Sequence, residues 1–152
     1  MREGQGERAA RDGRVFILSA EQRQQIIEQA LAEWPNEACG LLGGVNGRVL
    51  RVYPGANTLR SPVEYVMDPH DQIAAFQDIE AHGWEVIGIY HSHPTGPATP
   101  SLTDIARAYY PEAAYVILSL ADRSRPELRA YRILGGEVNE IPIRVEEPRG
   151  ET

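Results

Sequence analysis

Cysteine is almost absent from this chain, with one residue, Cys39, among 152. A single cysteine cannot form an internal disulfide, and it cannot supply the several thiolates of a multi-cysteine zinc site. Any bound metal must therefore be held by histidine and carboxylate side chains. An unpaired cysteine also fits a reducing compartment, so we expect a cytoplasmic protein.

The chain also lacks long apolar runs and clusters of basic residues. No stretch approaches the length that spans a bilayer, and residues 1–14 contain no apolar segment of the signal-peptide kind. The formal net charge is -7, whereas contacts to nucleic-acid phosphates need clustered Lys and Arg. We therefore expect neither a membrane protein nor a nucleic-acid binder.

Length and composition indicate one globular domain. A chain of 152 residues can bury one substantial core, and its 42% hydrophobic and 24% charged residues are ordinary globular values. Residues 1–14 are polar and carry charges of both signs, so we expect a flexible tail there. The domain should cover residues 15–145, with a second tail over 146–152. The oligomeric state is left open, with a homodimer among the options.

Turn residues and hydrophobic spacing predict many short strands and helices. Ser19 and Gln22 have the spacing of a capping box, and Asp68-Pro69 has the pattern of an N-cap with a first-turn proline. Asn46-Gly47 predicts a hairpin turn. The class is therefore α/β or α+β with a mixed, curved sheet. The expected helices cover residues 19–34, 68–83 and 101–110, and the expected strands cover residues 15–18, 38–45, 48–53, 63–67, 85–93, 115–120, 128–134 and 138–143.

His91 and His93 end the most apolar of these strands. Residues two apart on a strand point to the same side, so the two imidazoles can meet at one point. After the Pro- and Gly-rich loop of residues 94–100, Asp104 in the first turn of the next helix can bring a carboxylate there. Two histidines, one carboxylate and a water make the open tetrahedral set of a catalytic zinc site. We therefore expect one Zn²⁺ per chain, held by these three residues.

Two further residues are candidates for the chemistry. Glu37 precedes the segment ACGLLGG, whose small residues would let a strand edge lie beside the metal, and it is the candidate acid/base for the nucleophilic water. Ser101 can donate its hydroxyl to the oxyanion of a tetrahedral intermediate. Each has a plainer interpretation: Glu37 as a solvated residue after Pro35, and Ser101 as a helix cap. The residues taken alone leave both interpretations open.

The motif and its spacing resemble those of the JAMM or MPN+ zinc metalloproteases. The family pattern is a glutamate followed later by H-x-H-x7-S-x2-D, which is met by His91-Ser92-His93, Ser101 and Asp104 with Glu37 upstream. The resemblance covers residues 15–143 in element order. It implies a cytidine-deaminase-like α/β fold, zinc, and hydrolysis of peptide or isopeptide bonds after the C-terminal glycines of ubiquitin-like proteins.

The chain is too short for the long insertions with which eukaryotic members hold ubiquitin, so it is more similar to compact prokaryotic members. That resemblance implies small ubiquitin-like sulfur-carrier proteins ending in Gly-Gly, or adducts on them, as substrates. Their tail would lie extended along a sheet edge near the metal. The resemblance also implies roles for five residues: His91, His93 and Asp104 as ligands, Glu37 as acid/base and Ser101 as oxyanion donor.

Two other functions are compatible with parts of the sequence. Cys39 could attack as the nucleophile of a cysteine peptidase with His91 or His93 as its base, although free cysteine is more often buried and inert. A metal-free MPN scaffold is the second alternative, but such domains usually lack part of the ligand set, which is complete here. The sequence leaves open the carrier, the kind of bond cut and whether loop 94–100 gates the site.

Overall fold

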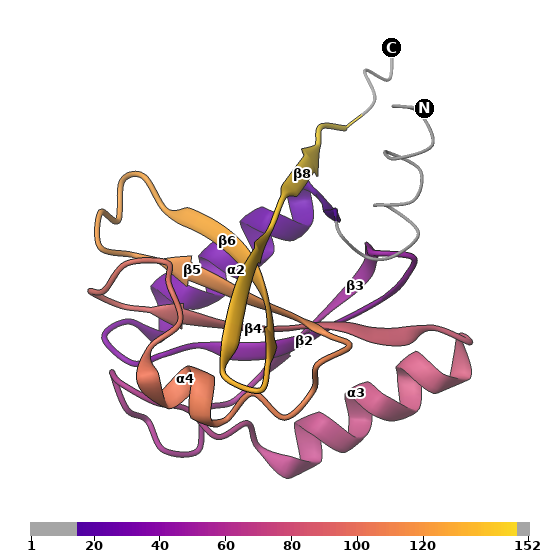
Figure 1. Cartoon of the computed structure of the whole chain (residues 1–152), viewed down its shortest axis with the longest axis horizontal. Coiled ribbons are helices and arrows are strands. Elements are labelled where there is room, and N and C mark those ends of the chain that lie inside the picture. Colours follow the sequence, from indigo (N-terminus) through magenta and orange to yellow (C-terminus); the bar gives the residue numbers. More distant parts are fainter. Residues whose placement is uncertain (1–14, 149–152) are drawn as a thin grey trace.

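The computed structural model describes residues 15–148, which form an eight-stranded sheet with three helices (Figure 1). The expected tail of residues 1–14 and the last four residues, 149–152, lie outside the described part. The helices are α2 (Ala20–Glu33), α3 (Pro69–Ala81) and α4 (Leu102–Ala106). The strands are β1 (Phe16–Ser19), β2 (Cys39–Val45), β3 (Arg48–Gly55), β4 (Glu85–His93), β5 (Ala114–Ser119), β6 (Glu127–Leu134), β7 (Glu137–Ile141) and β8 (Ile143–Glu146).

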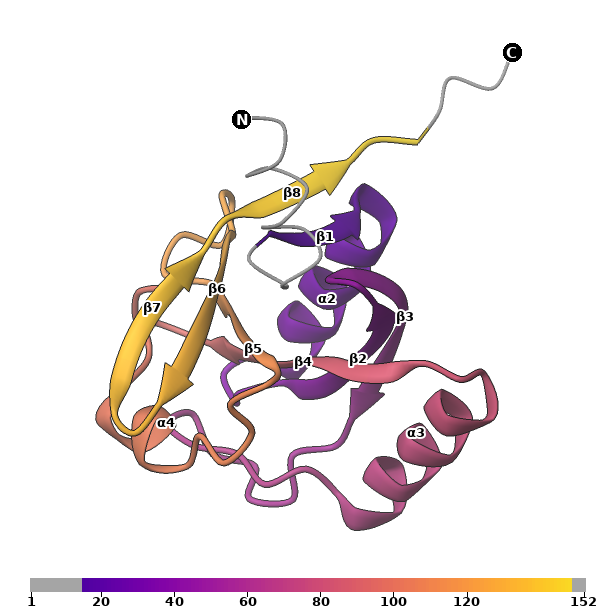
Figure 2. The same ribbon diagram turned by 45° about the vertical axis from the view of Figure 1, so that its right-hand side comes forward.

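The sheet is mixed and curved, as the sequence predicts, and it is also nearly closed. Its strand order is β7-β6-β5-β4-β2-β3-β1-β8, so the two outermost strands are consecutive in the chain. Only Pro142 separates them, and Figure 2 shows the chain running from β7 directly into β8. The expected single strand over 138–143 is therefore wrong. Because Pro142 has no N–H, the ladder with β6 ends at Ile141, and the Pro142 carbonyl instead accepts a hydrogen bond from the Phe16 N–H at 2.9 Å.

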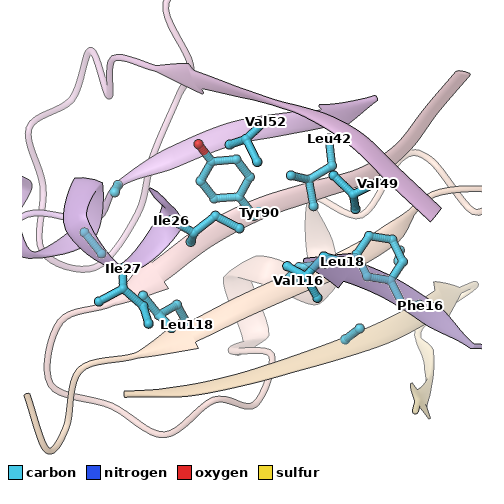
Figure 3. Packing of buried hydrophobic residues seen from close by; sticks show 14 of the residues in the cluster. Phe16, Leu18, Ile26, Ile27, Leu42, Val49, Val52, Tyr90, Val116 and Leu118 are labelled. Atoms are coloured by element: carbon cyan, nitrogen blue, oxygen red, sulfur yellow. The ribbon is translucent and has the colours of Figure 1, made fainter. Parts of the chain in front are cut away.

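Helices cover both faces of the sheet. α2 packs against β1, β3, β5 and β8, and α3 packs on the other face against β2, β3 and β4. Within residues 15–148, no helix combines the length and the apolar character needed to cross a bilayer. Figure 3 shows the main core, in which side chains from α2 and five strands point toward one another; those labelled are Phe16, Leu18, Ile26, Ile27, Leu42, Val49, Val52, Tyr90, Val116 and Leu118.

Strand alternation places the two histidines of β4 on the face away from this core. Tyr90 points into the core beneath α2, so its neighbour His91 and then His93 belong to the opposite face. On that face β5 and β6 form a second, smaller core with residues of loop 94–100 and α4. The site therefore lies where loop 94–100 and α4 cover the end of β4.

The locally encoded features are confirmed. Ser19 Oγ accepts the Gln22 N–H at 3.0 Å, and Gln22 Oε1 accepts the Ser19 N–H at 2.9 Å, so α2 begins with the expected capping box. Asn46 and Gly47 both have positive φ, as the expected two-residue hairpin turn requires. Asp68 caps α3, and Pro69 is its first residue.

Of the other expected elements, one strand is absent and one helix is shorter than expected. Residues 63–67 form no strand, apart from a single bridge between Met67 and Asn57. Asn57 takes up the backbone groups that a strand would offer to a neighbour: its Oδ1 accepts the N–H groups of Leu59 and Val66. The helix expected over 101–110 ends at Ala106, well before Pro111.

Candidate metal site

Three donor atoms meet at the end of β4. The Nε2 atoms of His91 and His93 lie 3.1 Å apart, and Asp104 Oδ2 lies 3.1 Å from the first and 3.0 Å from the second. Tetrahedral zinc with ligands at about 2.0–2.1 Å separates its ligand atoms by about 3.3 Å. The triangle therefore fits a zinc ion after a shift of a few tenths of an ångström, and α4 contributes its third corner as the sequence predicts.

Burial and mutual contact set the charges of this triad. Burial raises the pKa of Asp104, but hydrogen bonds with His91 and His93 outweigh it and hold that pKa far below its usual value. Burial lowers the pKa of His91. Burial also opposes the charged form of His93, yet its contacts with Asp104 and the Pro97 carbonyl raise its pKa. An ionised carboxylate between imidazoles is the charge arrangement that a divalent cation requires.

The two histidines are held by different contacts. His93 Nδ1 lies 2.7 Å from the carbonyl oxygen of Pro97, an acceptor, so Nδ1 carries a proton and Nε2 faces His91 and Asp104. His91 Nδ1 is buried and has no hydrogen-bond partner in the described part of the chain. The His91 ring is instead stacked on Tyr65, with centroids 4.9 Å apart.

Ser101 is the cap of α4. Its Oγ accepts the Asp104 N–H at 3.0 Å, while Asp104 Oδ2 accepts the Ser101 N–H at 2.9 Å. The cap thus orients the metal-site carboxylate. The hydroxyl proton of Ser101 is not used in these two bonds, so the side chain can both cap the helix and donate to a ligand.

Glu37 is buried directly before β2, with 3% of its surface exposed, so its interpretation as a solvated residue is wrong. Its Oε1 has no hydrogen-bond partner among residues 15–148. Burial, with further contributions from Asp104 and Glu64 and an opposing one from His93, raises the pKa of Glu37 from 4.5 to about 8. A buried carboxylate with a free oxygen and a pKa near neutrality is suited to accept and return a proton.

The segment after Glu37 does not have the geometry that we expect from its small residues. β2 lies in the middle of the sheet between β4 and β3, and it is not an edge beside the metal. Its glycines make room for core side chains: a Cβ on Gly40 would lie 2.3 Å from the Tyr90 ring, and one on Gly43 would lie 2.8 Å from Ile79.

A cavity of about 320 Å³ joins these residues. Its walls include Glu37, His93 and Ser101, together with residues of loop 94–100 and Pro62 and Val63. The two expected catalytic residues thus face the same space as a metal-site histidine. On the other side of the triad, His91 and Asp104 border a cavity of about 170 Å³ that adjoins a larger, mainly apolar one of about 360 Å³.

Residues beside Glu37 hold its backbone in place. Ser92 Oγ accepts the Ala38 N–H at 2.8 Å, which ties β4 to the residue after Glu37. Asn57 Nδ2 donates to the Glu37 carbonyl at 3.1 Å, and the Glu37 N–H donates to the Ser61 carbonyl at 2.8 Å. Ser92 is the middle residue of the His91-Ser92-His93 motif, whereas no sequence signal pointed to Asn57.

Cys39 does not fit the role of nucleophile. It is fully buried, and burial raises the pKa of its thiol to about 12. Its Sγ lies 3.8 Å from the Gly55 carbonyl. A thiolate would therefore be scarce at neutral pH and out of reach of substrate, which argues against a cysteine peptidase.

Comparisons with known proteins identify relatives over most of the chain. The family described as prokaryotic homologs of the JAB domain matches residues 19–134. The CysO-cysteine peptidase of Mycobacterium tuberculosis is 39% identical over 135 residues, which are 88% of this chain and 92% of the relative. The desampylase of Haloferax volcanii is 34% identical over 136 residues, covering 85% and 95%.

Solved structures match the fold. The solution structure of a protein from Desulfitobacterium hafniense has a TM-score of 0.79 at 38% identity, covering 88% of this chain and 94% of that one. A structure described as JAMM, a metalloprotease-like zinc site in the proteasome and signalosome, has a TM-score of 0.55 at 18% identity, covering 86% and 98%. The latter likeness concerns the fold alone.

Proposed function

The chain belongs to the family of prokaryotic homologs of the JAB domain, and from that premise we propose that it is a zinc-dependent isopeptidase. Its substrate is a small ubiquitin-like or sulfur-carrier protein, and the bond cut follows the C-terminal Gly-Gly of that carrier. The observation that carries the proposal is the convergence of His91, His93 and Asp104 beside a buried carboxylate, Glu37, with an unpaired oxygen. The names of the two relatives, a CysO-cysteine peptidase and a desampylase, support the carrier class.

His91, His93 and Asp104 would hold one Zn²⁺. When bound, zinc supplies a Lewis acid that lowers the pKa of a water and polarises a carbonyl group. The ligand residues contribute two neutral imidazoles and one carboxylate, and they leave a fourth position free. Their burial keeps bulk water from competing for the cation.

Glu37 moves the proton. Its burial makes the ionised carboxylate a stronger base than one in water, and a nearby cation would lower its pKa and so favour the ionised form. Glu37 takes a proton from the attacking water and returns it to the leaving amine. The hydrogen bonds that fix its backbone, from Asn57 and to Ser61, keep the carboxylate aimed into the cavity.

Ser101 donates its hydroxyl to the oxyanion that forms during attack, since it borders the same cavity as Glu37 and His93. The cavity of about 170 Å³ beside His91 and Asp104 is narrowed by aromatic side chains and by Arg107. Residues without side chains pass such a constriction most easily, which is consistent with a Gly-Gly tail. We place the protein in the cytoplasm, where Cys39 stays reduced.

The test is cleavage of defined conjugates by the zinc-loaded protein, followed by mass spectrometry. One conjugate joins a Gly-Gly-ended carrier to cysteine through a peptide bond, and a second joins it to a lysine side chain. We expect release of the carrier ending in Gly-Gly, loss of cleavage with a chelator, and recovery with added zinc. Failure of the zinc-loaded protein on both conjugates, or cleavage that survives Glu37→Gln, would refute the proposal.

A further inference from the structure

Loop 94–100 is attached to the rest of the molecule through its carbonyl groups. Four carbonyls of the loop each accept a hydrogen bond from a side chain, and the four donors come from different parts of the fold. The bonds are Trp34 Nε1 to Pro94 at 3.3 Å, Ser119 Oγ to Gly96 at 2.6 Å, His93 Nδ1 to Pro97 at 2.7 Å and Tyr131 Oη to Ala98 at 2.5 Å.

Two of these donors have their hydroxyl directions fixed by the sheet. Ser119 lies opposite His93 in the β4–β5 pair, and its Oγ accepts the Ala121 N–H at 3.2 Å. Its proton therefore goes to Gly96. Tyr131, on β6, is packed in the smaller core with Ala98 itself. Both side chains are only 4% exposed, so water does not compete for either bond.

The residues that Ser119 and Tyr131 hold are the immediate neighbours of Pro97. The proline ring fixes φ at Pro97, and the carbonyls of Gly96 and Ala98 are anchored on either side of it. The Pro97 carbonyl has little freedom left to rotate. It is therefore held toward His93 Nδ1.

We propose that Ser119 and Tyr131 are positioning residues for the metal site. By holding the Pro97 carbonyl, they keep the His93 Nδ1–H hydrogen-bonded and its Nε2 turned toward His91 and Asp104. The inference rests on the proposed metal site, but the hydrogen bond that it describes belongs to the protein itself. It also assigns loop 94–100 the role of a fixed wall of the catalytic cavity, and not that of a movable gate.

His91 shows that the arrangement is specific to one ligand. Its Nδ1 has no hydrogen-bond partner in the described chain, and its ring is fixed by burial and by stacking on Tyr65. Of the two imidazoles, only that of His93 donates to a loop carbonyl, that of Pro97, whose neighbours are held by Ser119 and Tyr131. Outer hydrogen bonds of this kind typically affect metal affinity by about 10- to 100-fold.

The experiment compares Ser119→Ala, Tyr131→Phe and the double variant with wild type. Zinc affinity is measured by competition with a chromophoric chelator, the His93 Nδ1–H hydrogen bond by ¹⁵N NMR, and metal-free stability by thermal melting. We expect zinc affinity to fall by about 10- to 100-fold in the double variant, with loss of the hydrogen-bonded His93 Nδ1–H signal. Ser119→Thr, which keeps the hydroxyl, should restore affinity in place of Ser119→Ala.

Tyr115→Phe is the matched control. Tyr115 pairs with Tyr131 across β5 and β6 and lies in the same core, but its hydroxyl accepts the Tyr110 N–H at 2.9 Å, and no hydrogen bond among the described residues joins it to loop 94–100. Tyr115→Phe should lose comparable stability and keep both zinc affinity and the His93 Nδ1–H hydrogen bond.

The outcomes separate this inference from the proposed function. Wild-type zinc affinity and an unchanged His93 Nδ1–H signal in folded Ser119→Ala and Tyr131→Phe single variants would overturn the inference, and so would equal affinity loss in Tyr115→Phe. A wild-type protein that binds no zinc would instead overturn the proposed function. Because the hydrogen bond is read in the metal-free protein, the inference can be tested even then.

Discussion

Two loops border the catalytic cavity, and the chain holds them in different ways. Loop 94–100 is held by four side chains from other parts of the fold, which donate hydrogen bonds to its carbonyls. The loop of residues 57–67 is held mainly from inside, because Asn57 uses its amide to bind the carbonyls of Glu37 and Glu64 and the N–H groups of Leu59 and Val66. Its tip is exposed to solvent, with Val63 at 72%.

The two loops support different residues of the proposed active site. The first loop supports His93, a metal ligand, and the second supports the backbone of Glu37, the proposed base. Metal binding and proton transfer are therefore supported by separate sets of contacts. Substitutions in these two sets of contacts should therefore have separate effects on zinc content and on turnover. The following predictions test that separation, from the largest expected effect to the smallest.

Asp104→Lys should have the largest effect. It replaces the only carboxylate of the triad with a cation, so zinc content should fall to background and activity with it. Elemental analysis of the purified variant checks this. Glu80→Lys makes the same charge change at an exposed position of α3 and should keep a full complement of zinc.

Glu37→Gln should remove turnover and leave the metal in place. Loss of a positioned acid/base costs about 10²–10⁴-fold in rate, whereas Glu37 is not one of the three converging ligand residues. Parallel assays of conjugate cleavage and zinc content measure the two effects. If Glu37→Gln loses zinc as Asp104→Lys does, the proposed separation of metal binding from proton transfer is wrong.

The same substitution should change the pH dependence of stability in the metal-free protein. Burial raises the pKa of Glu37 from 4.5 to about 8, so between these pH values the folded state binds a proton that the unfolded state has lost. This contribution to stability is fully present below pH 4.5 and disappears as the pH rises through 8. Melting curves with a chelator should show Glu37→Gln gaining on wild type from pH 5 to pH 8; parallel pH profiles would contradict the burial argument.

Asn57→Ala should loosen the second loop and leave the first intact. It deletes a donor of hydrogen bonds to two carbonyls and should destabilise the fold by about 1–3 kcal/mol. Displacement of Glu37 should lower kcat by roughly 10- to 100-fold, while zinc affinity stays at the wild-type value. Chemical denaturation measures the free energy of unfolding, steady-state kinetics measure kcat, and chelator competition measures the zinc affinity. A variant with reduced zinc affinity and normal kcat would reverse the expected pattern.

Glu64→Gln should have the smallest effect. Glu64 pairs with Arg107 at 3.3 Å across the outer side of the loop, and both side chains are well exposed. Exposed ion pairs contribute about 0–1 kcal/mol, so the melting temperature should hardly move, and zinc content should be unchanged. A large loss of stability would show that the outer side of this loop is held more firmly than its exposure indicates.

The sequence predicted what depends on short separations. The capping box of Ser19 and Gln22, the turn at Asn46-Gly47 and the meeting of His91, His93 and Asp104 all follow from spacing within one or two elements. Strand alternation sufficed for the histidines, and a helix start sufficed for the carboxylate. The curved, mixed sheet followed from the alternation of strands and helices.

The features that the sequence did not predict depend on contacts between distant segments. The break at Pro142 is decided by pairing with β1, at the other end of the chain. The absence of a strand over 63–67 is decided by the side chain of Asn57, which competes for backbone groups. The glycines of β2 serve the packing of Tyr90 and Ile79, which no local pattern shows. The burial of Glu37 likewise required the resemblance or the structure.

The most direct test of the account is the zinc content of the purified protein beside a variant carrying His91→Ala and His93→Ala. The account predicts about one zinc per chain in wild type and background levels in the variant, with both proteins folded. No zinc in carefully handled wild type, and none taken up on addition, would contradict the metal site on which the proposed function depends.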